Sequence, residues 1–226
     1  MIKSINRGRL LLRLCLFLFV PLLGNMVVYP AFAMDFRTAS IGTTCKGKCP
    51  VVIVATGEIY NNTDQEFVAF LKSLPTNRVQ RTMIIQSPGG SLLGSMKFGI
   101  VLRATKMRTI VGKVLEVGGR SIPVSGACMS ACVYAIMGGT SRYVLASCKI
   151  GIHRATTAGS GGDSPISVLL QQRRMPEDVG VLLRSYTKYM GVNPRIIDWA
   201  EKIGPGGIRI LTPPEITQLR LAKIGR

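Results

Sequence analysis

The chain has 226 residues, of which 47% are hydrophobic and 18% charged, a balance that excludes an intrinsically disordered protein. Lysine and arginine (29) outnumber aspartate and glutamate (11), so the formal net charge is +18 at pH 7. Such a basic surface suits nucleic acid, anionic lipid headgroups or acidic cell-wall polymers. Because no run of basic residues is interleaved with aromatic ones, we expect no nucleic-acid partner and favour an anionic envelope surface.

The first 33 residues predict a secretory signal peptide. A positively charged segment precedes a mostly apolar stretch at 14–29, and Ala31-Phe32-Ala33 has the small-x-small pattern of a cleavage site before Met34. Residues 34–226 then form a single domain in a periplasmic or secreted protein. The alternative is an uncleaved segment that anchors the protein in the inner membrane, although the apolar run is interrupted before it reaches the roughly 20 residues of a spanning helix.

Apolar periodicity predicts strands that alternate with helices in the rest of the chain. Strands are expected at 51–55, 83–86, 108–111, 143–145 and 149–152, with a short segment at 208–211. Helices are expected at 64–74, 91–104, 131–137, 168–189, 194–202 and after the capping box of Thr212 and Glu215. A glycine-rich insertion contains Gly118-Gly119, and 155–165 has the composition of a flexible loop. This alternation predicts an α/β fold with a mainly parallel, buried sheet.

Three features carry the chemistry. Ser87-Pro88-Gly89-Gly90 follows an apolar strand, Ser130 lies in a stretch of small residues, and His153 is the single histidine of the chain. A neutral imidazole is the side chain best suited to take a proton from a serine hydroxyl near pH 7. The three features therefore indicate an oxyanion hole, a nucleophile and a general base.

Four ordered segments resemble the proteolytic subunit of the Clp protease, over nearly the whole chain from Val51 to Ile224. They are Gln86-Ser87-Pro88-Gly89-Gly90, Gly126-Ala127-Cys128-Met129-Ser130, Lys149-Ile150-Gly151-Ile152-His153 and Ile210-Leu211-Thr212-Pro213-Pro214-Glu215. The resemblance is to exported bacterial proteins of this kind within the crotonase-like superfamily. It implies a ClpP/crotonase-like fold, a mainly parallel sheet built from βα repeats flanked by helices.

The resemblance also implies roles for individual residues. Ser130 would be the nucleophile at the start of a helix, and His153 would be general base and then general acid. The backbone amides of Gly89 and Ala131 would form the oxyanion hole. An extended peptide would lie beside the strand from Gly90 onward by β-augmentation.

The same resemblance bears on assembly. The segments 155–165 and 168–189 fall where the family has its ring-to-ring handle, so it implies a homo-oligomer. Because the chain has no Gly-x-x-x-x-Gly-Lys-Ser/Thr pattern and no ATP is expected outside the inner membrane, we identify no ATPase partner. The expected substrate is a peptide or an unfolded protein that arrives unaided.

One position departs from the family pattern. Ile208 stands where the third catalytic residue, an aspartate, is expected. Asp198 or Glu201 could supply the carboxylate from the preceding helix, or the enzyme could use a Ser-His dyad with lower rate. The third interpretation is a degraded enzyme that binds peptides without cutting them.

The cysteines predict disulfides but not their pairing. Cys45 and Cys49 could close a small loop. Cys128 and Cys132 have i,i+4 spacing, and because disulfide geometry is poor at that spacing in a helix, we expect one of them to pair with Cys148. We expect no metal site and no cofactor, since zinc would need four ligands and would take His153 from its other role.

Our leading hypothesis is therefore an exported serine peptidase of ClpP-like fold. The alternative is an envelope binding or scaffold protein on the same fold. An acyl-CoA enzyme of the crotonase type is a further alternative, for which a nucleophilic serine would be superfluous.

Overall fold

The computed structural model describes residues 33–42, 49–75, 79–145, 147–155, 177–204 and 206–225. All of them belong to one unit, Ala31–Arg226. Its main sheet has the strand order β1-β2-β3-β4-β8-β11. These strands are β1 (Asp35–Ser40), β2 (Val51–Thr56), β3 (Val79–Gln86), β4 (Arg108–Val111), β8 (Ser141–Val144) and β11 (Lys223–Ile224). Only β1 runs antiparallel to its neighbour, so the mainly parallel α/β sheet predicted from the sequence is confirmed.

A smaller sheet continues from the end of β3. It has the order β10-β9-β7, formed by β7 (Ala127–Met129), β9 (Lys149–Ile152) and β10 (Arg209–Ile210). Ser87, directly after β3, bridges to Cys128, with Ser87 N–H donating to the Ala127 carbonyl and Met129 N–H to the Ser87 carbonyl. The segments that carry Ser130 and His153 are thereby joined to the carboxyl end of β3.

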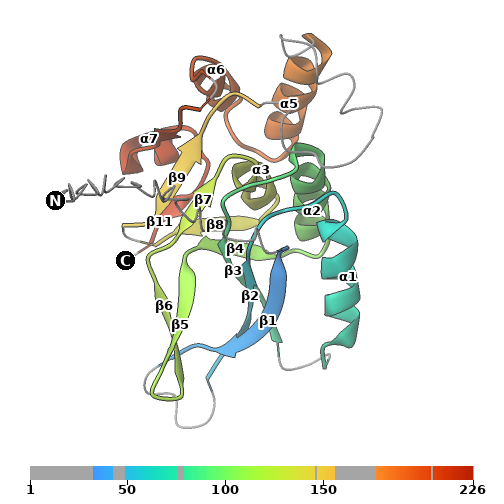
Figure 1. The fold of residues 1–226 in the computed structure, drawn as a ribbon, viewed down its shortest axis with the longest axis vertical. Coiled ribbons are helices and arrows are strands. Elements are labelled where there is room, and N and C mark those ends of the chain that lie inside the picture. Colours follow the sequence, from blue (N-terminus) through green and yellow to red (C-terminus); the bar gives the residue numbers. More distant parts are fainter. Residues whose placement is uncertain are drawn as a thin grey trace, which may run out of the picture. The chain divides into compact units, whose positions relative to one another are not determined.

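Helices connect the parallel strands. They are α1 (Thr63–Ser73), α2 (Leu92–Ala104), α3 (Cys132–Met137), α5 (Glu177–Tyr189), α6 (Arg195–Glu201) and α7 (Pro213–Gln218). Figure 1 shows α1 and α2 on one side of the main sheet, where Phe67 of α1 and Phe98 of α2 contact each other edge to face and are fully buried. The first part of the helix predicted at 168–189, and most of the loop predicted at 155–165, lie outside the described residues.

Five strands were not predicted from the sequence. The lead-in before residue 51 contains β1, and the glycine-rich insertion is a hairpin of β5 (Lys113–Val117) and β6 (Arg120–Val124). The other two are β7, just before Ser130, and β11, after the last helix. Gly118 and Gly119 join its strands with φ angles of 56° and 72°, the left-handed conformation that a tight hairpin turn requires. In Figure 1 the hairpin extends to the end of the unit opposite α5 and α6.

Helix α3 packs unusually close to α2. A Cβ placed on Gly138, at the end of α3, would lie 1.9 Å from the carbonyl oxygen of Gly99 in α2. The Tyr186 hydroxyl of α5 donates to the Tyr134 carbonyl of α3 at 2.8 Å, and α3 is buried along its whole length. The backbones can approach to this distance only because both positions lack side chains.

Two arginines hold the carboxyl end of α3. The guanidinium of Arg142 donates to the carbonyls of Met137 and Gly139, and both Arg142 and Arg103 donate to the Met190 carbonyl after α5. Burial, together with the nearby charge of Arg103, lowers the pKa of Arg142 to about 10. Cations placed at carbonyls left unpaired at helix ends stabilise those ends.

No helix in the described part of the chain is long and apolar enough to cross a membrane.

Candidate active site

Ser130 occupies a sharp turn between β7 and α3. Its φ angle is 55°, a left-handed conformation that costs a non-glycine residue about 1–2 kcal/mol. Its N–H donates to the Gly151 carbonyl at 2.8 Å, which fixes the turn against β9. Strained backbone of this kind gathers at functional sites, and a strand-turn-helix elbow of this kind exposes a serine hydroxyl.

His153 follows β9 directly and meets this turn. β9 pairs in parallel with β7, with Met129 opposite Gly151, so the residues that follow the two strands emerge at the same edge. The distance between His153 Nε2 and Ser130 Oγ is 2.6 Å. Both side chains are half-buried. A proton transfer from a serine hydroxyl to an imidazole requires a separation of this size.

The two backbone N–H groups predicted as oxyanion donors lie at the same turn, but only one of them already has a hydrogen-bond acceptor. Gly89 packs against it, since a Cβ on Gly89 would lie 2.8 Å from the Ser130 Cβ and 3.1 Å from the Ala131 nitrogen. Gly89 N–H donates to the Ser87 hydroxyl at 3.1 Å. For Ala131 N–H, at the amino end of α3, the structure has no acceptor among the residues it describes.

Gly90 presents a second amide near the turn. Gly90 forms a parallel β-bridge with Ile59. The Ile59 N–H donates to the Gly89 carbonyl (2.8 Å), and the Ile59 carbonyl accepts from Ser91 N–H (2.7 Å). In a parallel bridge of this pattern, the N–H and C=O of Gly90 itself point to the other side of the strand. The hydrogen bond between the Ser87 hydroxyl and Gly89 N–H was not predicted from the sequence, in which Ser87 was interpreted only as part of a turn.

The two predicted carboxylates are paired with arginines instead of His153. Asp198 forms an ion pair with Arg184 at 2.6 Å, and Glu201 forms one with Arg154 at 3.3 Å. Within the described ranges, neither carboxylate forms a hydrogen bond with His153.

Ile208 lies beside the histidine strand. Arg209 pairs with Ile152 in the antiparallel β10-β9 ladder, so continuing the register by one residue brings position 208 opposite His153. The position at which a carboxylate could orient the imidazole is therefore occupied by a hydrocarbon side chain.

A small apolar pocket adjoins Ser130 and His153, and its cavity volume is about 10 Å³, enough for about one water molecule. Its other walls come from α3, the end of β9 and α6, and they are Val133, Tyr134, Met137, Ile152, Ile196, Ile197 and Ala200. Arg154 binds both the carbonyl and the carboxylate of Glu201, which ties the end of α6 to the residue after His153. The contribution of α6 to this pocket carried no signal in the sequence beyond ordinary helical periodicity.

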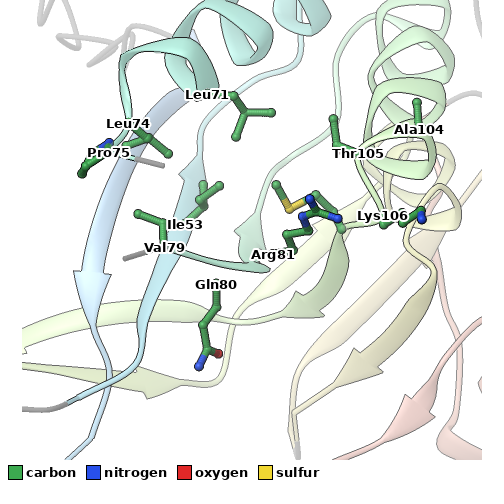
Figure 2. Close-up of a pocket in the computed structure, with 11 residues that line it drawn as sticks. Ile53, Leu71, Leu74, Pro75, Val79, Gln80, Arg81, Ala104, Thr105 and Lys106 are labelled. Carbon is green, nitrogen blue, oxygen red and sulfur yellow. The ribbon is translucent and has the colours of Figure 1, made fainter. Parts of the chain in front are cut away.

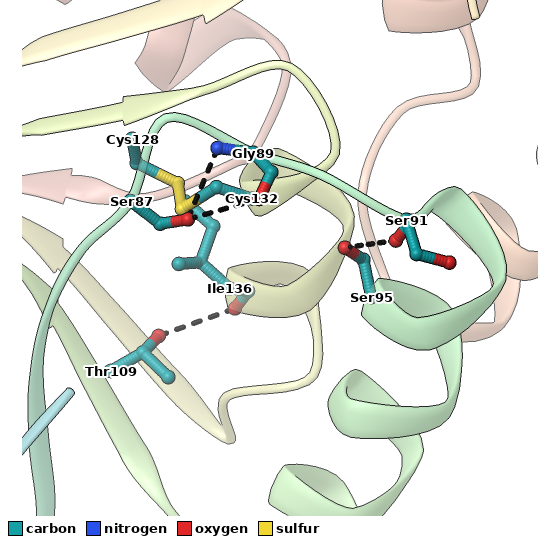
Figure 3. The surroundings of a disulfide bond; sticks show 8 residues. All are labelled: Ser87, Gly89, Ser91, Ser95, Thr109, Cys128, Cys132 and Ile136. Atoms are coloured by element: carbon teal, nitrogen blue, oxygen red, sulfur yellow. Dashed lines mark hydrogen bonds between the residues drawn. A yellow bond between two sulfur atoms is a disulfide. The ribbon is translucent and has the colours of Figure 1, made fainter. Parts of the chain in front are cut away.

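The disulfide prediction was wrong. Cys128 and Cys132 form a disulfide with a Cα–Cα distance of 5.4 Å (Figure 3). The thiol of Cys148 is free. The expectation assumed helical geometry from 128 to 132, whereas Cys128 is in β7, Ser130 turns the chain, and only Cys132 is in α3. Cys49 is also disulfide-bonded, and the predicted partner Cys45 lies outside the described residues.

A larger cavity, of about 510 Å³, lies away from this chemistry (Figure 2). It is lined by Leu71 at the end of α1, Val79 at the start of β3 and Lys106 after α2. This is the amino end of β3, opposite the end that carries the Pro-Gly-Gly turn. Among the residues described, no group of three or more histidine, cysteine, aspartate or glutamate side chains could hold a metal ion.

No protein-family model matches the chain, and no curated protein matches its sequence. Solved structures do match. A serine-to-alanine variant of the 1510-N membrane-bound stomatin-specific protease aligns with 16% identity and a TM-score of 0.50, covering 76% of each chain. A lysine-to-alanine variant of that protease in complex with a substrate peptide aligns with 19% identity and a TM-score of 0.49, covering 76% of this chain and 72% of that one.

ClpP1 from Listeria monocytogenes aligns with 15% identity and a TM-score of 0.47, covering 76% of this chain and 91% of its own. At 16% identity, the likeness to the stomatin-specific protease shows a shared fold alone. Together with the sheet order, it confirms the ClpP/crotonase-like fold that the sequence predicts.

Proposed function

We propose that this chain is a serine peptidase in which Ser130 is the nucleophile and His153 the general base. The observation that carries the proposal is the 2.6 Å distance between His153 Nε2 and Ser130 Oγ at a left-handed turn. His153 takes the hydroxyl proton as Ser130 Oγ attacks the scissile carbonyl. It then gives the proton to the leaving amine, and a water molecule hydrolyses the acyl-enzyme by the same route.

Two backbone groups would stabilise the oxyanion. Ala131 N–H, at the amino end of α3, has no acceptor among the described residues and gains from the positive end of the helix dipole. The Gly89-Gly90 turn would supply the second donor. Gly89 serves this role only by leaving the Ser87 hydroxyl, whereas Gly90 N–H is directed away from Ile59.

The enzyme would work as a dyad. Ile208 cannot accept a hydrogen bond from the imidazole, and Asp198 and Glu201 are held by arginines. In serine proteases with a triad, changing the aspartate to asparagine lowers kcat about 10⁴-fold but leaves measurable catalysis. We therefore expect slow turnover.

The substrate would be an extended peptide or an unfolded protein segment. The C=O of Gly90 on the side away from Ile59 suits backbone pairing by β-augmentation, and its N–H does so where Gly89 supplies the oxyanion donor. The apolar residues around the pocket beside Ser130 would contact an apolar side chain only after the pocket widens from its present volume of about 10 Å³. The composition of residues 1–33 supports export to the periplasm or outside, where the basic surface would meet an anionic envelope. Homo-oligomerisation belongs to the same proposal and rests on the resemblance of the sequence.

The test is covalent labelling. The purified protein is exposed to a fluorophosphonate probe and analysed by intact mass, beside a Ser130→Ala control. A single mass addition in the wild type and none in the control is the expected result. Equal peptide hydrolysis by both proteins would overturn the proposal.

A second candidate function is peptide binding without cleavage. The hydrocarbon side chain of Ile208 beside the strand of His153 favours it, since an imidazole without a partner carboxylate is a poorer base. It predicts no labelling of the folded wild type, together with measurable peptide affinity.

A further inference from the structure

The Cys128–Cys132 disulfide encloses the candidate nucleophile. The covalent loop runs from Cys128 in β7, through Ser130, to Cys132 at the first turn of α3. Both cysteines are fully buried, and Figure 3 shows the bridge next to Ser87 and Gly89. The bridge therefore joins the strand side and the helix side of the turn, with Ser130 between them.

The turn within this loop is held in a conformation that the backbone disfavours. Ser130 has a φ angle of 55°, and a serine there relaxes toward negative φ when its surroundings permit. Such a rotation would move the hydroxyl away from His153 Nε2, which now lies 2.6 Å from it. It would also disturb the contact with Gly89, whose added Cβ would meet the Ser130 Cβ at 2.8 Å.

Hydrogen bonds restrain the strand side of the turn. Met129 N–H donates to the Ser87 carbonyl at 3.0 Å, and Ser130 N–H donates to the Gly151 carbonyl at 2.8 Å. On the helix side, Val133 N–H donates to the Ser130 carbonyl at 3.1 Å, whereas Ala131 N–H has no acceptor among the residues described. Besides the backbone through Ser130 and Ala131, the disulfide is a second covalent link between β7 and the start of α3.

We propose that the Cys128–Cys132 disulfide positions Ser130, so that the serine reacts efficiently only while this pair is oxidised. The inference rests on the proposed function and adds a redox requirement to it. In thiol–disulfide exchange with a dithiol, the sulfur–sulfur bond of the pair breaks. Cys128 and Cys132 take up two electrons and two protons, and the dithiol becomes a disulfide.

This requirement links the reactivity of Ser130 to the predicted export, because the oxidation state of the cysteine pair depends on the compartment. Disulfides form in oxidising compartments, whereas cysteine thiols are kept reduced in the cytosol. A chain still in the cytosol would hold Cys128 and Cys132 as thiols and present a displaced Ser130. The peptidase would then react efficiently only after it reaches the oxidising compartment to which residues 1–33 are predicted to direct it.

The experiment compares fluorophosphonate labelling rates of three proteins. They are the oxidised wild type, a Cys128→Ala/Cys132→Ala double variant, and a Cys148→Ala control that removes the free thiol outside the loop. Rates are measured by intact mass well below the unfolding temperature, so that loss of stability alone does not change them. Because a displacement of about 1 Å lowers reactivity about 100-fold, we expect a 10- to 100-fold slower rate in the double variant and an unchanged rate in the control.

A second measurement keeps the inference testable if the double variant does not fold. The wild type and a Cys49→Ala variant, which lacks the other disulfide, are both reduced with dithiothreitol. Alkylation and mass analysis confirm that the Cys128–Cys132 pair is open, and circular dichroism confirms the fold. Slower labelling that recovers on reoxidation supports the inference. Unchanged labelling of the reduced protein, or of a folded double variant, overturns it. An oxidised wild type that does not label at all contradicts the proposed function, and the inference falls with it.

Discussion

Ile208 lies against Gly151, two residues before His153. A Cβ on Gly151 would come within 2.6 Å of the Ile208 Cδ1, and the β10-β9 register brings position 208 opposite the histidine. A side chain at this position is therefore close to the strand that delivers the imidazole, and about half of its surface is exposed.

An Ile208→Asp variant should be a better peptidase than the wild type. A carboxylate there could accept a hydrogen bond from the second imidazole nitrogen and stabilise the imidazolium. Because a triad aspartate is worth up to about 10⁴ in kcat, we expect a gain of at least about tenfold. Peptide hydrolysis and labelling rates check it, with Ile208→Asn as a control of similar shape without charge. Equal rates in the two variants would show that a charge at 208 does not act on His153.

A Glu201→Gln variant should change substrate binding more than turnover. It weakens the ion pair with Arg154, which ties α6 to the residue after His153, and α6 lines the pocket beside Ser130. The pair is partly exposed and worth about 1 kcal/mol at most, so we expect KM for a peptide with an apolar side chain at the cleavage site to rise up to about fivefold. The expected kcat is nearly unchanged.

The matched control is Asp198→Asn, which changes another carboxylate of α6, breaks its ion pair with Arg184 of α5 and should leave both constants unchanged. A fall of kcat by several orders of magnitude in either variant would instead identify that carboxylate as the missing third catalytic residue.

A Glu215→Ala variant should lose stability in a pH-dependent way. The Thr212 N–H donates to the Glu215 carboxylate at 2.8 Å and lowers the pKa of that carboxyl, with Arg209 adding to the effect. Because the folded pKa is below the unfolded one, the contribution is complete above the ordinary value of 4.5 and is lost as the pH falls through the folded pKa. We expect a loss of about 1 kcal/mol in the free energy of unfolding at pH 7.

Urea unfolding at pH 7 and near pH 3 measures this difference. The gap between wild type and variant should narrow at the lower pH, while Glu66→Ala, in the exposed first turn of α1, should give a smaller change at pH 7. A gap that is constant with pH would contradict the assignment.

A Gly138→Ala variant should be strongly destabilised. Its new Cβ would lie 1.9 Å from the Gly99 carbonyl oxygen, which is backbone and cannot move without shifting α2. Overpacking of this kind costs about 1–3 kcal/mol. Thermal unfolding checks it against Gly204→Ala, where the added methyl group would meet nothing within 4 Å. Equal unfolding temperatures for the two variants would refute the close contact of the two helices.

Residue types and the resemblance indicated Ser130 and His153 as partners, and their side chains lie 2.6 Å apart. The parallel pairing of β7 and β9, which brings both residues to one edge, was not predicted, because 127–129 is a short stretch without a strand pattern. Apolar runs located several strands and helices around the main sheet, as in β2 and α2.

What the sequence did not predict depends on backbone angles and on contacts between distant segments. The disulfide was misjudged because the i,i+4 spacing of Cys128 and Cys132 means something different across a left-handed turn than within a helix. The pairing of Glu201 with Arg154 depends on where α6 lies, which no local pattern encodes. The hairpin at Gly118-Gly119 was within reach, since two glycines between alternating segments are a turn signal.

The glycine contact between α2 and α3 also sets a distance elsewhere in the molecule. α2 begins directly after the Gly89-Gly90 turn, and α3 begins directly after Ser130 and Ala131, so each helix carries one half of the candidate site at its amino end. The two helices meet about two turns further on, where Gly99 and Gly138 allow their backbones to touch. The distance between Ser130 and the Gly89-Gly90 turn therefore depends on how closely Gly99 and Gly138 let the two helices approach, and we expect substitutions at these two glycines to change it.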